Sequence, residues 1–434
     1  MSAAKAPALP VRSERPNKAR RWAWLLLVLL NLVTTGCGIA DDRAQLFATV
    51  SSSRVAPTSP TEIPSSPAPG GVTSAAAGEA TPGPASTAAV MGETVAGARA
   101  ADERAGRLNS YLVALSEQNQ FWGTVLVAQD GEILLNEGYG PADVASGRAN
   151  GPNTQYRIGS LTKQFTAAAI MRLQELGRLD VNDPLSLYLP EYPNSGAISL
   201  HQLLTHTSGV ANYTRRPDLE QIVQTPIALD DLIAEIAAVP PDFAPGERFA
   251  YSDSGYVLLT KVIEVASGQP YADFLQQQFF DPLDMASSGY DFLAPGVIEP
   301  ATGYQLTPAG PRPAVKTDAS WPSGAGALYS NAADLYRWDR ALGGREILDA
   351  TSEEAIFTPW VDSGQGFSYG YGWEIGQMAG RASQMHAGTI FGFASFIARF
   401  PQEEATIILL SNGLQQSPRE ISSELARILF ESTS

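Results

Sequence analysis

The chain has a single cysteine, only three histidines and little positive charge. Across 434 residues, 29 Lys and Arg stand against 45 Asp and Glu, which gives a formal net charge of −16. One cysteine excludes an intramolecular disulfide framework and a cysteine-rich zinc module. The histidines form no HExxH motif, so neither a metal nor another cofactor is expected. The acidic balance argues against a nucleic-acid partner, which would require a basic surface.

The first 37 residues have the pattern of an export signal. A cluster of Lys and Arg precedes the apolar run 22–33. This run is too short to span a bilayer, which takes about 20 residues, and it fits the apolar core of a secretory signal. The small residues 34–36 and then Cys37 resemble a bacterial lipobox, although Thr34 stands where an aliphatic residue is preferred. We expect export with a lipid on Cys37 that anchors the protein to a membrane. Cleavage nearby without a lipid, or an uncleaved anchor, are the alternatives.

Residues 38–100 predict a linker between this signal and one folded domain, residues 101–434. The linker segment is rich in Pro, Ala, Gly, Ser and Thr, and it has no aromatic residue after Phe47. Such a segment cannot bury enough apolar surface to offset the entropy lost on ordering. The 44% of hydrophobic residues in the chain is enough for a sizeable core elsewhere.

Strand signals at both ends of the folded domain flank a helical middle. Residues 121–128 and 132–139 predict a hairpin, with Asp130-Gly131 as its turn. Further strands are predicted at 371–375, 393–400 and 405–410. Helix signals are a run at 160–176, a start at Asp183-Pro184, capping-box spacings at Ser199 and Ser417, and a final helix from 418 to about 431. This order predicts a sheet assembled from both ends, with a helical region inserted.

Ser160 and Lys163 lie three residues apart where a helix is expected to begin, so their side chains share one face. Serine becomes a nucleophile when a base accepts its proton, and a desolvated lysine can assist. The helix start would also aim backbone N–H groups at the reacting oxygen. Alone, the pattern is more typical of a capping serine on a surface helix.

Two further stretches make the pattern specific. After Ser160-x-x-Lys163 the chain has Tyr251-Ser252-Asp253 and then His386-Ala387-Gly388. In this order the three stretches resemble the motifs of the serine β-lactamase-related family. That family includes class C β-lactamases, D-peptidases, D-aminopeptidases and esterases. The order and spacing of the family motifs also match three further segments, 203–209, 326–338 and 369–373. The resemblance therefore covers about residues 105–434. It implies an α/β (α+β) fold, in which an antiparallel sheet flanked by helices adjoins an all-helical subdomain.

The resemblance also implies roles in an acyl-enzyme mechanism. Ser160 would attack a carbonyl carbon, and Lys163 and Tyr251 would transfer protons. The Lys163 ammonium would favour a tyrosinate at Tyr251, which makes that residue the expected base. The backbone N–H groups of Ser160 and Thr389 would form the oxyanion hole.

Three departures bear on the substrate. His386 replaces a lysine and is expected to be partly charged near neutral pH, with more charge toward pH ~6.5. Ala387 lacks a hydroxyl. Asp253 replaces an asparagine, cannot donate a hydrogen bond when ionised, and is expected to raise the pKa of Lys163. With Thr389, Asp253 and His386 are the predicted substrate contacts.

These departures favour a small ester, amide or D-amino-acid peptide over penicillins. A β-lactamase, a penicillin-binding sensor or D,D-peptidase with slow turnover, and a non-catalytic scaffold stay open as alternatives. Outside the motifs, His206 is expected to orient its loop rather than to catalyse. Asn331 and Asp334 are expected to support a helix start.

Overall fold

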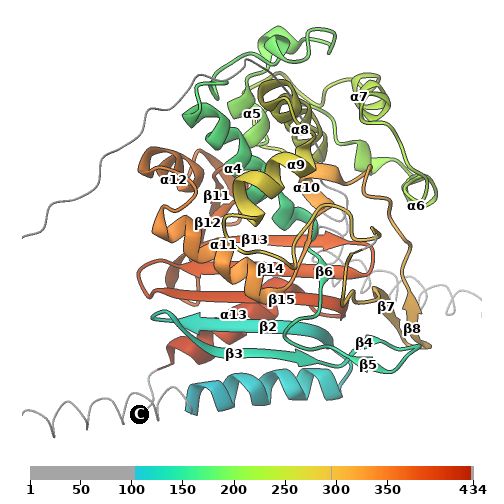
Figure 1. Ribbon diagram of the computed structural model, residues 1–434, viewed down its shortest axis with the longest axis vertical. Coiled ribbons are helices and arrows are strands. Elements are labelled where there is room, and N and C mark those ends of the chain that lie inside the picture. The colour runs from blue at the N-terminus through green and yellow to red at the C-terminus, as the bar shows by residue number, and fades with distance from the viewer. Residues whose placement is uncertain (1–102, 295, 432–434) are drawn as a thin grey trace, which may run out of the picture. The chain divides into compact units, whose positions relative to one another are not determined.

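The computed structural model describes residues 103–294 and 296–431 (Figure 1). The predicted signal (1–37) and linker (38–100) lie outside the described residues. Among the residues that the structure describes, no helix has the length and apolar character needed to cross a membrane.

The centre of the fold is an eight-stranded antiparallel sheet, ordered β10-β11-β12-β13-β14-β15-β2-β3. The N-terminal strand β2 pairs with the C-terminal strand β15, which confirms a sheet built from both ends of the domain. The strands are β2 (Phe121–Gln129), β3 (Glu132–Tyr139), β10 (Val361–Gly364), β11 (Phe367–Tyr369), β12 (Glu374–Met378), β13 (Arg381–Ile390), β14 (Phe393–Phe400) and β15 (Ala405–Leu414). Three small two-stranded sheets are β4 (Pro141–Asp143) with β5 (Arg148–Ala149), β6 (Tyr156–Arg157) with β9 (Tyr329–Ser330), and β7 (Tyr304–Thr307) with β8 (Gly310–Pro313).

One predicted turn is confirmed, and one turn that was not predicted displaces a predicted strand. Asp130 and Gly131 have φ of 53° and 81°, as the hairpin turn between β2 and β3 requires. The strand predicted at 371–375 is wrong in position, because Gly372, with φ of 75°, reverses the chain between β11 and β12. A Cβ at Gly372 would lie 2.7 Å from the Lys163 carbonyl oxygen, so this turn packs directly on the helix that carries Lys163.

Alternating residues of the central strands enter two separate hydrophobic clusters. In β2, Val125 and Val127 belong to one cluster, while Leu126 and Ala128 belong to the other. Successive side chains of a strand point to opposite faces, so both faces of the sheet are covered. The helix 103–117 and α13 (Pro418–Phe430) supply residues to the first cluster, and the remaining helices supply the second (Figure 1).

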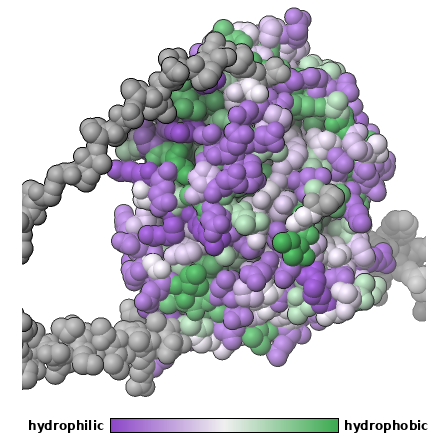
Figure 2. Space-filling model, viewed as in Figure 1, coloured by the Kyte–Doolittle hydropathy of each residue, from purple (hydrophilic) through white to green (hydrophobic). Residues whose placement is uncertain are grey.

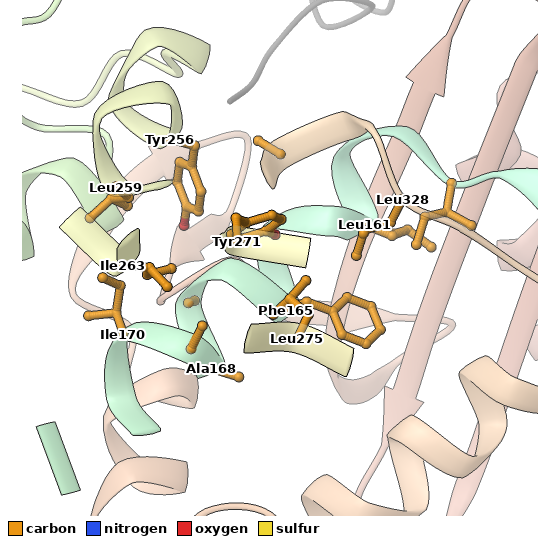
Figure 3. Packing of buried hydrophobic residues seen from close by; sticks show 14 of the residues in the cluster. Leu161, Phe165, Ala168, Ile170, Tyr256, Leu259, Ile263, Tyr271, Leu275 and Leu328 are labelled. Atoms are coloured by element: carbon orange, nitrogen blue, oxygen red, sulfur yellow. The ribbon is translucent and has the colours of Figure 1, made fainter. Parts of the chain in front are cut away.

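The helical region lies between β6 and β10 in sequence and packs on the second face (Figure 1). Its core joins α4 to α8 and α9: Ile170 lies beside Ile263, and Phe165 lies beside Leu275 (Figure 3). The elements are η2 (Gly159–Leu161), α4 (Thr162–Glu175), η3 (Leu185–Leu187), η4 (Ser195–Ala197), α5 (Leu200–Leu204), η5 (Tyr213–Arg215), α6 (Leu219–Ile222), α7 (Leu229–Ala237), α8 (Asp253–Ser267), α9 (Tyr271–Leu275), η6 (Gln276–Phe280), α10 (Ser323–Gly326), α11 (Ala332–Gly344) and α12 (Ala350–Phe357).

Helix starts follow local side-chain chemistry in most of the predicted places. Ser199 and Gln202 form the expected capping box, and Asn331 accepts the Asp334 N–H at the start of α11, as expected. After Asp183-Pro184 the structure has only the short 3₁₀ turn η3 rather than an α-helix. The face seen in Figure 2 is mostly hydrophilic with separate smaller apolar areas, as an acidic chain of this composition would present.

Candidate active site

Ser160 lies in η2, where two glycines allow a strand edge to approach it closely. A Cβ on Gly159 would lie 2.7 Å from the backbone nitrogen of Thr389. A Cβ on Gly388 would lie 2.1 Å from the carbonyl oxygen of Ile158 and 3.1 Å from the nitrogen of Ser160. No side chain fits at either position without displacing backbone. The nitrogens of Ser160 and Thr389, the predicted oxyanion pair, therefore belong to backbone segments in direct contact.

Lys163 reaches Ser160 from the first turn of α4. Its Nζ donates to the Ser160 Oγ at 3.3 Å and lies 3.5 Å from the Asp253 Oδ1. Both Lys163 and Asp253 have fully buried side chains. Burial lowers the pKa of Lys163 to about 7, although the Asp253 carboxylate acts in the opposite direction. Burial therefore favours the neutral amine of Lys163 more than water does for a free lysine.

Asp253 begins α8 and faces inward rather than toward solvent. Its Oδ2 accepts hydrogen bonds from the Asn212 Nδ2 at 2.6 Å and from the Thr214 Oγ1 at 3.3 Å. Burial raises the pKa of Asp253 to about 6, while the Lys163 ammonium opposes that rise. Asp253 does lie beside Lys163 and favour its charged form, as expected, but burial is the larger effect. Its role in substrate binding stays a prediction.

Tyr251 closes the other side of Ser160. Its hydroxyl hydrogen-bonds to Ser160, and the Lys163 Nζ lies 4.7 Å from its ring centroid. Burial first, and then the Asp253 carboxylate, raise the pKa of Tyr251 well above its ordinary value. This direction contradicts the expected tyrosinate, because the loss of hydration and the neighbouring carboxylate both disfavour a charged phenolate. Tyr251 is a neutral phenol next to the serine.

His386 on β13 is also neutral, which contradicts the partial charge expected from its sequence. The residue is 2% exposed, and burial with the nearby Lys163 lowers its pKa to about 3. Its Nδ1 lies 2.6 Å from the Ala387 carbonyl, which can only accept, so Nδ1 carries the proton. Its Nε2 then accepts from the Tyr369 hydroxyl at 2.9 Å. His386 and Ala387 lead along the strand to Thr389, which is partly exposed.

Several contributors to this site were not predicted. Asn212 and Thr214 reach Asp253 from 41 and 39 residues away, and no local pattern marks them. Tyr369 lies in segment 369–373, which the sequence linked to the family pattern without giving Tyr369 a role. In the structure it contacts both His386 and Tyr256. Within residues 103–294 and 296–431, no three His, Cys, Asp or Glu side chains form a group that could hold a metal ion.

The fold and these motifs agree with comparisons to known proteins. The model of the Beta-lactamase family matches residues 108–429, and this chain belongs to that family. It is similar to the "Putative penicillin-binding protein PbpX" of Bacillus subtilis (strain 168), with 32% identity over 317 residues, 73% of this chain and 76% of that protein.

Two solved structures are similar as well. The octameric penicillin-binding protein homologue from Pyrococcus abyssi has 28% identity and a TM-score of 0.67, covering 75% of this chain and 77% of that one. The penicillin binding protein from Bacillus halodurans has 29% identity and a TM-score of 0.65, covering 74% and 100%. Both the family resemblance and the predicted fold class are confirmed.

Proposed function

We propose that this protein is an exported serine hydrolase that forms an acyl-enzyme on a small ester, amide or D-amino-acid peptide. The observation that carries the proposal is the contact of the Ser160 hydroxyl with both Lys163 and Tyr251. A nucleophile within hydrogen-bond reach of a base, which is itself held by a third group, is the arrangement that activates serine. Asp253 is that third group.

In the acylation step, the neutral amine of Lys163 accepts the Ser160 proton as Oγ forms a bond to the carbonyl carbon. The backbone N–H groups of Ser160 and Thr389 would stabilise the developing oxyanion. The protonated phenol of Tyr251 is placed to donate to the leaving group as its bond to carbon breaks, and Lys163 then returns a proton to Tyr251. Water attacks the acyl-enzyme by the reverse sequence of proton transfers.

The charges around the site support a substrate without a carboxylate at the position that a penicillin would occupy. His386 is neutral, Ala387 has no hydroxyl, and the enclosed Asp253 carries no donor. An anionic group beside β13 would therefore meet no cation from His386 and would lie near the buried carboxylate. A neutral or amine-bearing substrate needs no cation from His386 and is not repelled by the Asp253 carboxylate.

Asp253→Asn tests this substrate assignment. We expect kcat/KM for a chromogenic cephalosporin to rise several-fold relative to a p-nitrophenyl ester, since one hydrogen bond to a neutral partner contributes about 1 kcal/mol. The variant also removes the anion that favours the charged form of Lys163. The rising limb of kcat/KM against pH should therefore shift to lower pH, because the free amine persists there.

Asp334→Asn is the matched control. It removes another buried carboxylate, which accepts hydrogen bonds from the Ser287 N–H and the Ser288 hydroxyl rather than from the groups around Lys163. We expect neither the substrate ratio nor the pH profile to change in this variant. Efficient cephalosporin hydrolysis by the unsubstituted protein would overturn the substrate assignment.

A penicillin-binding role is the second candidate, because the similar Bacillus subtilis protein carries that name. The same Ser160, Lys163 and Tyr251 geometry would serve acylation by a β-lactam. Stoichiometric labelling by a fluorescent penicillin without turnover, together with inert p-nitrophenyl esters and D-amino-acid amides, would favour this candidate over the hydrolase.

We also propose that the protein is anchored at a membrane through a lipid on Cys37 and held away from it by residues 38–100. Cys37→Ser should release the folded domain in soluble form or leave the signal uncleaved. Membrane fractionation and intact-mass analysis measure both outcomes. Cleavage well after Cys37 with no lipid on the native protein would refute the anchor while leaving export intact.

A further inference from the structure

His206 is a buried histidine to which the proposed chemistry gives no task. It is 1% exposed and its φ is 57°, in the left-handed region that few residues other than glycine adopt. Such a backbone persists only where surrounding contacts hold it, and it is frequent at functional sites. Its ring contacts Tyr251, Tyr256 and Tyr369, with centroids 4.2, 5.1 and 4.7 Å away.

His206 contacts the segment 250–252 at three points. Its carbonyl oxygen accepts the Ala250 N–H at 3.0 Å, and its Nδ1 lies 3.1 Å from the Ser252 nitrogen. Between these two contacts its ring lies against the ring of Tyr251, with 35° between the planes. Residues 250–252 belong to no helix or strand, so regular secondary structure does not hold Tyr251 in place.

The hydrogen bond to Ser252 also selects a tautomer. The His206 Nδ1 is equally close, at 3.1 Å, to the Ser252 carbonyl oxygen. Ser252 is the N-cap of α8, and the carbonyl of an N-cap already accepts the first bond of its helix. Its N–H is buried and needs an acceptor. In the arrangement proposed below, Nδ1 accepts this N–H, which places the proton on Nε2, a buried atom with no hydrogen-bond partner among the described residues. Burial and Lys163 hold the pKa of His206 well below its ordinary value, so the ring stays a neutral acceptor.

We propose that His206 is a positioning residue that holds the Tyr251 phenol against Ser160, by accepting the Ser252 N–H on Nδ1 and by stacking on the Tyr251 ring. The inference rests on the proposed function, in which Tyr251 transfers a proton during acyl transfer. The proposed reaction gives His206 no proton to transfer, so its expected effect on catalysis comes from the placement of Tyr251.

A pair of variants separates the hydrogen bond from the backbone conformation. Asn and Gly both tolerate the left-handed φ, but only Asn places an acceptor where Nδ1 stood. We expect His206→Gly to lower kcat for a p-nitrophenyl ester on the order of 10- to 100-fold with little change in KM, as misplacing a catalytic group does. We expect His206→Asn to recover most of that loss. Wild-type kcat in both variants, or equal losses in both, would overturn the proposal.

His201→Asn is the matched control, because His201 also hydrogen-bonds to a tyrosine, Tyr371, and contacts its ring edge-on. Its kcat should stay unchanged. If thermal unfolding shows that His206→Gly merely lowers the folded fraction, kcat corrected for that fraction would equal the wild-type value, and the proposal would fail.

Two measurements need no activity and so separate this inference from the proposed function. The chain has three histidines, so ¹⁵N-labelled rings give few signals, which single substitutions assign. His206 should show an unprotonated Nδ1 and a protonated Nε2; the opposite tautomer would overturn the inference. A crystal structure of His206→Gly should show the Tyr251 ring displaced from Ser160, and an unmoved ring would likewise overturn it. If the unsubstituted protein is inert to all acyl substrates while both results hold, the proposed function alone has failed.

Discussion

Ser160→Ala is expected to abolish covalent labelling and to reduce hydrolysis by ~10⁴- to 10⁶-fold, since loss of a serine nucleophile removes the acyl-enzyme route altogether. The Ser160 hydroxyl contacts both Lys163 and Tyr251, as a nucleophile of this mechanism must. Intact-mass analysis after treatment with a fluorophosphonate should show one adduct on the unsubstituted protein and none on the variant.

Ser323→Ala controls for the loss of any buried serine. Ser323 is 5% exposed and lies in α10, in a Pro-Ser-Gly-Ala-Gly stretch that lacks the first glycine of a nucleophile elbow. This variant should keep the adduct and the rate. An adduct or full hydrolysis that persists in Ser160→Ala would remove Ser160 from the mechanism.

Lys163→Met should impair catalysis and stability together. Loss of a general base lowers the acylation rate by typically 10²- to 10⁴-fold. The variant also leaves the fully buried Asp253 without its cation, and breaking a buried ion pair from one side costs about 3–5 kcal/mol. Without Lys163, the pKa of Asp253 rises further, because Lys163 is the main group that lowers it.

The size of this stability loss depends on pH. A carboxyl group with a raised pKa in the folded state binds its proton more tightly there than in the unfolded chain. The folded variant is therefore least impaired at low pH and loses stability as the pH rises above ~4, the ordinary pKa of an aspartate. Thermal unfolding at pH 5 and pH 8 measures this difference.

The double variant Lys163→Met/Asp253→Asn separates the two effects. It has no uncompensated carboxylate, so we expect it to recover stability at pH 8, while acylation stays as slow as in the single variant. A single variant as stable as the unsubstituted protein at pH 8 would show that Asp253 does not depend on Lys163. A wild-type acylation rate would exclude Lys163 as the base.

Patterns within a few residues were sufficient for much of the fold. The turn at Asp130-Gly131 and the capping box at Ser199 were predictable because the groups that form them are neighbours in the chain. The spacing of Ser160 and Lys163 likewise placed both side chains on one side of a helix start. The strand predicted at 371–375 failed because the approach of Gly372 to α4 is a contact between distant segments, which no local pattern contains.

The sequence by itself determined which residues the proposed acyl transfer would use, and it placed Ser160 and Lys163 at a helix start. Only the tertiary structure decided their protonation. Burial is the largest cause for both residues: with Asp253 it raises the pKa of Tyr251, and with Lys163 it lowers the pKa of His386. Burial and the charges of Lys163 on α4 and Asp253 on α8 shift these pKa values from their ordinary range, and only folding brings these groups close together.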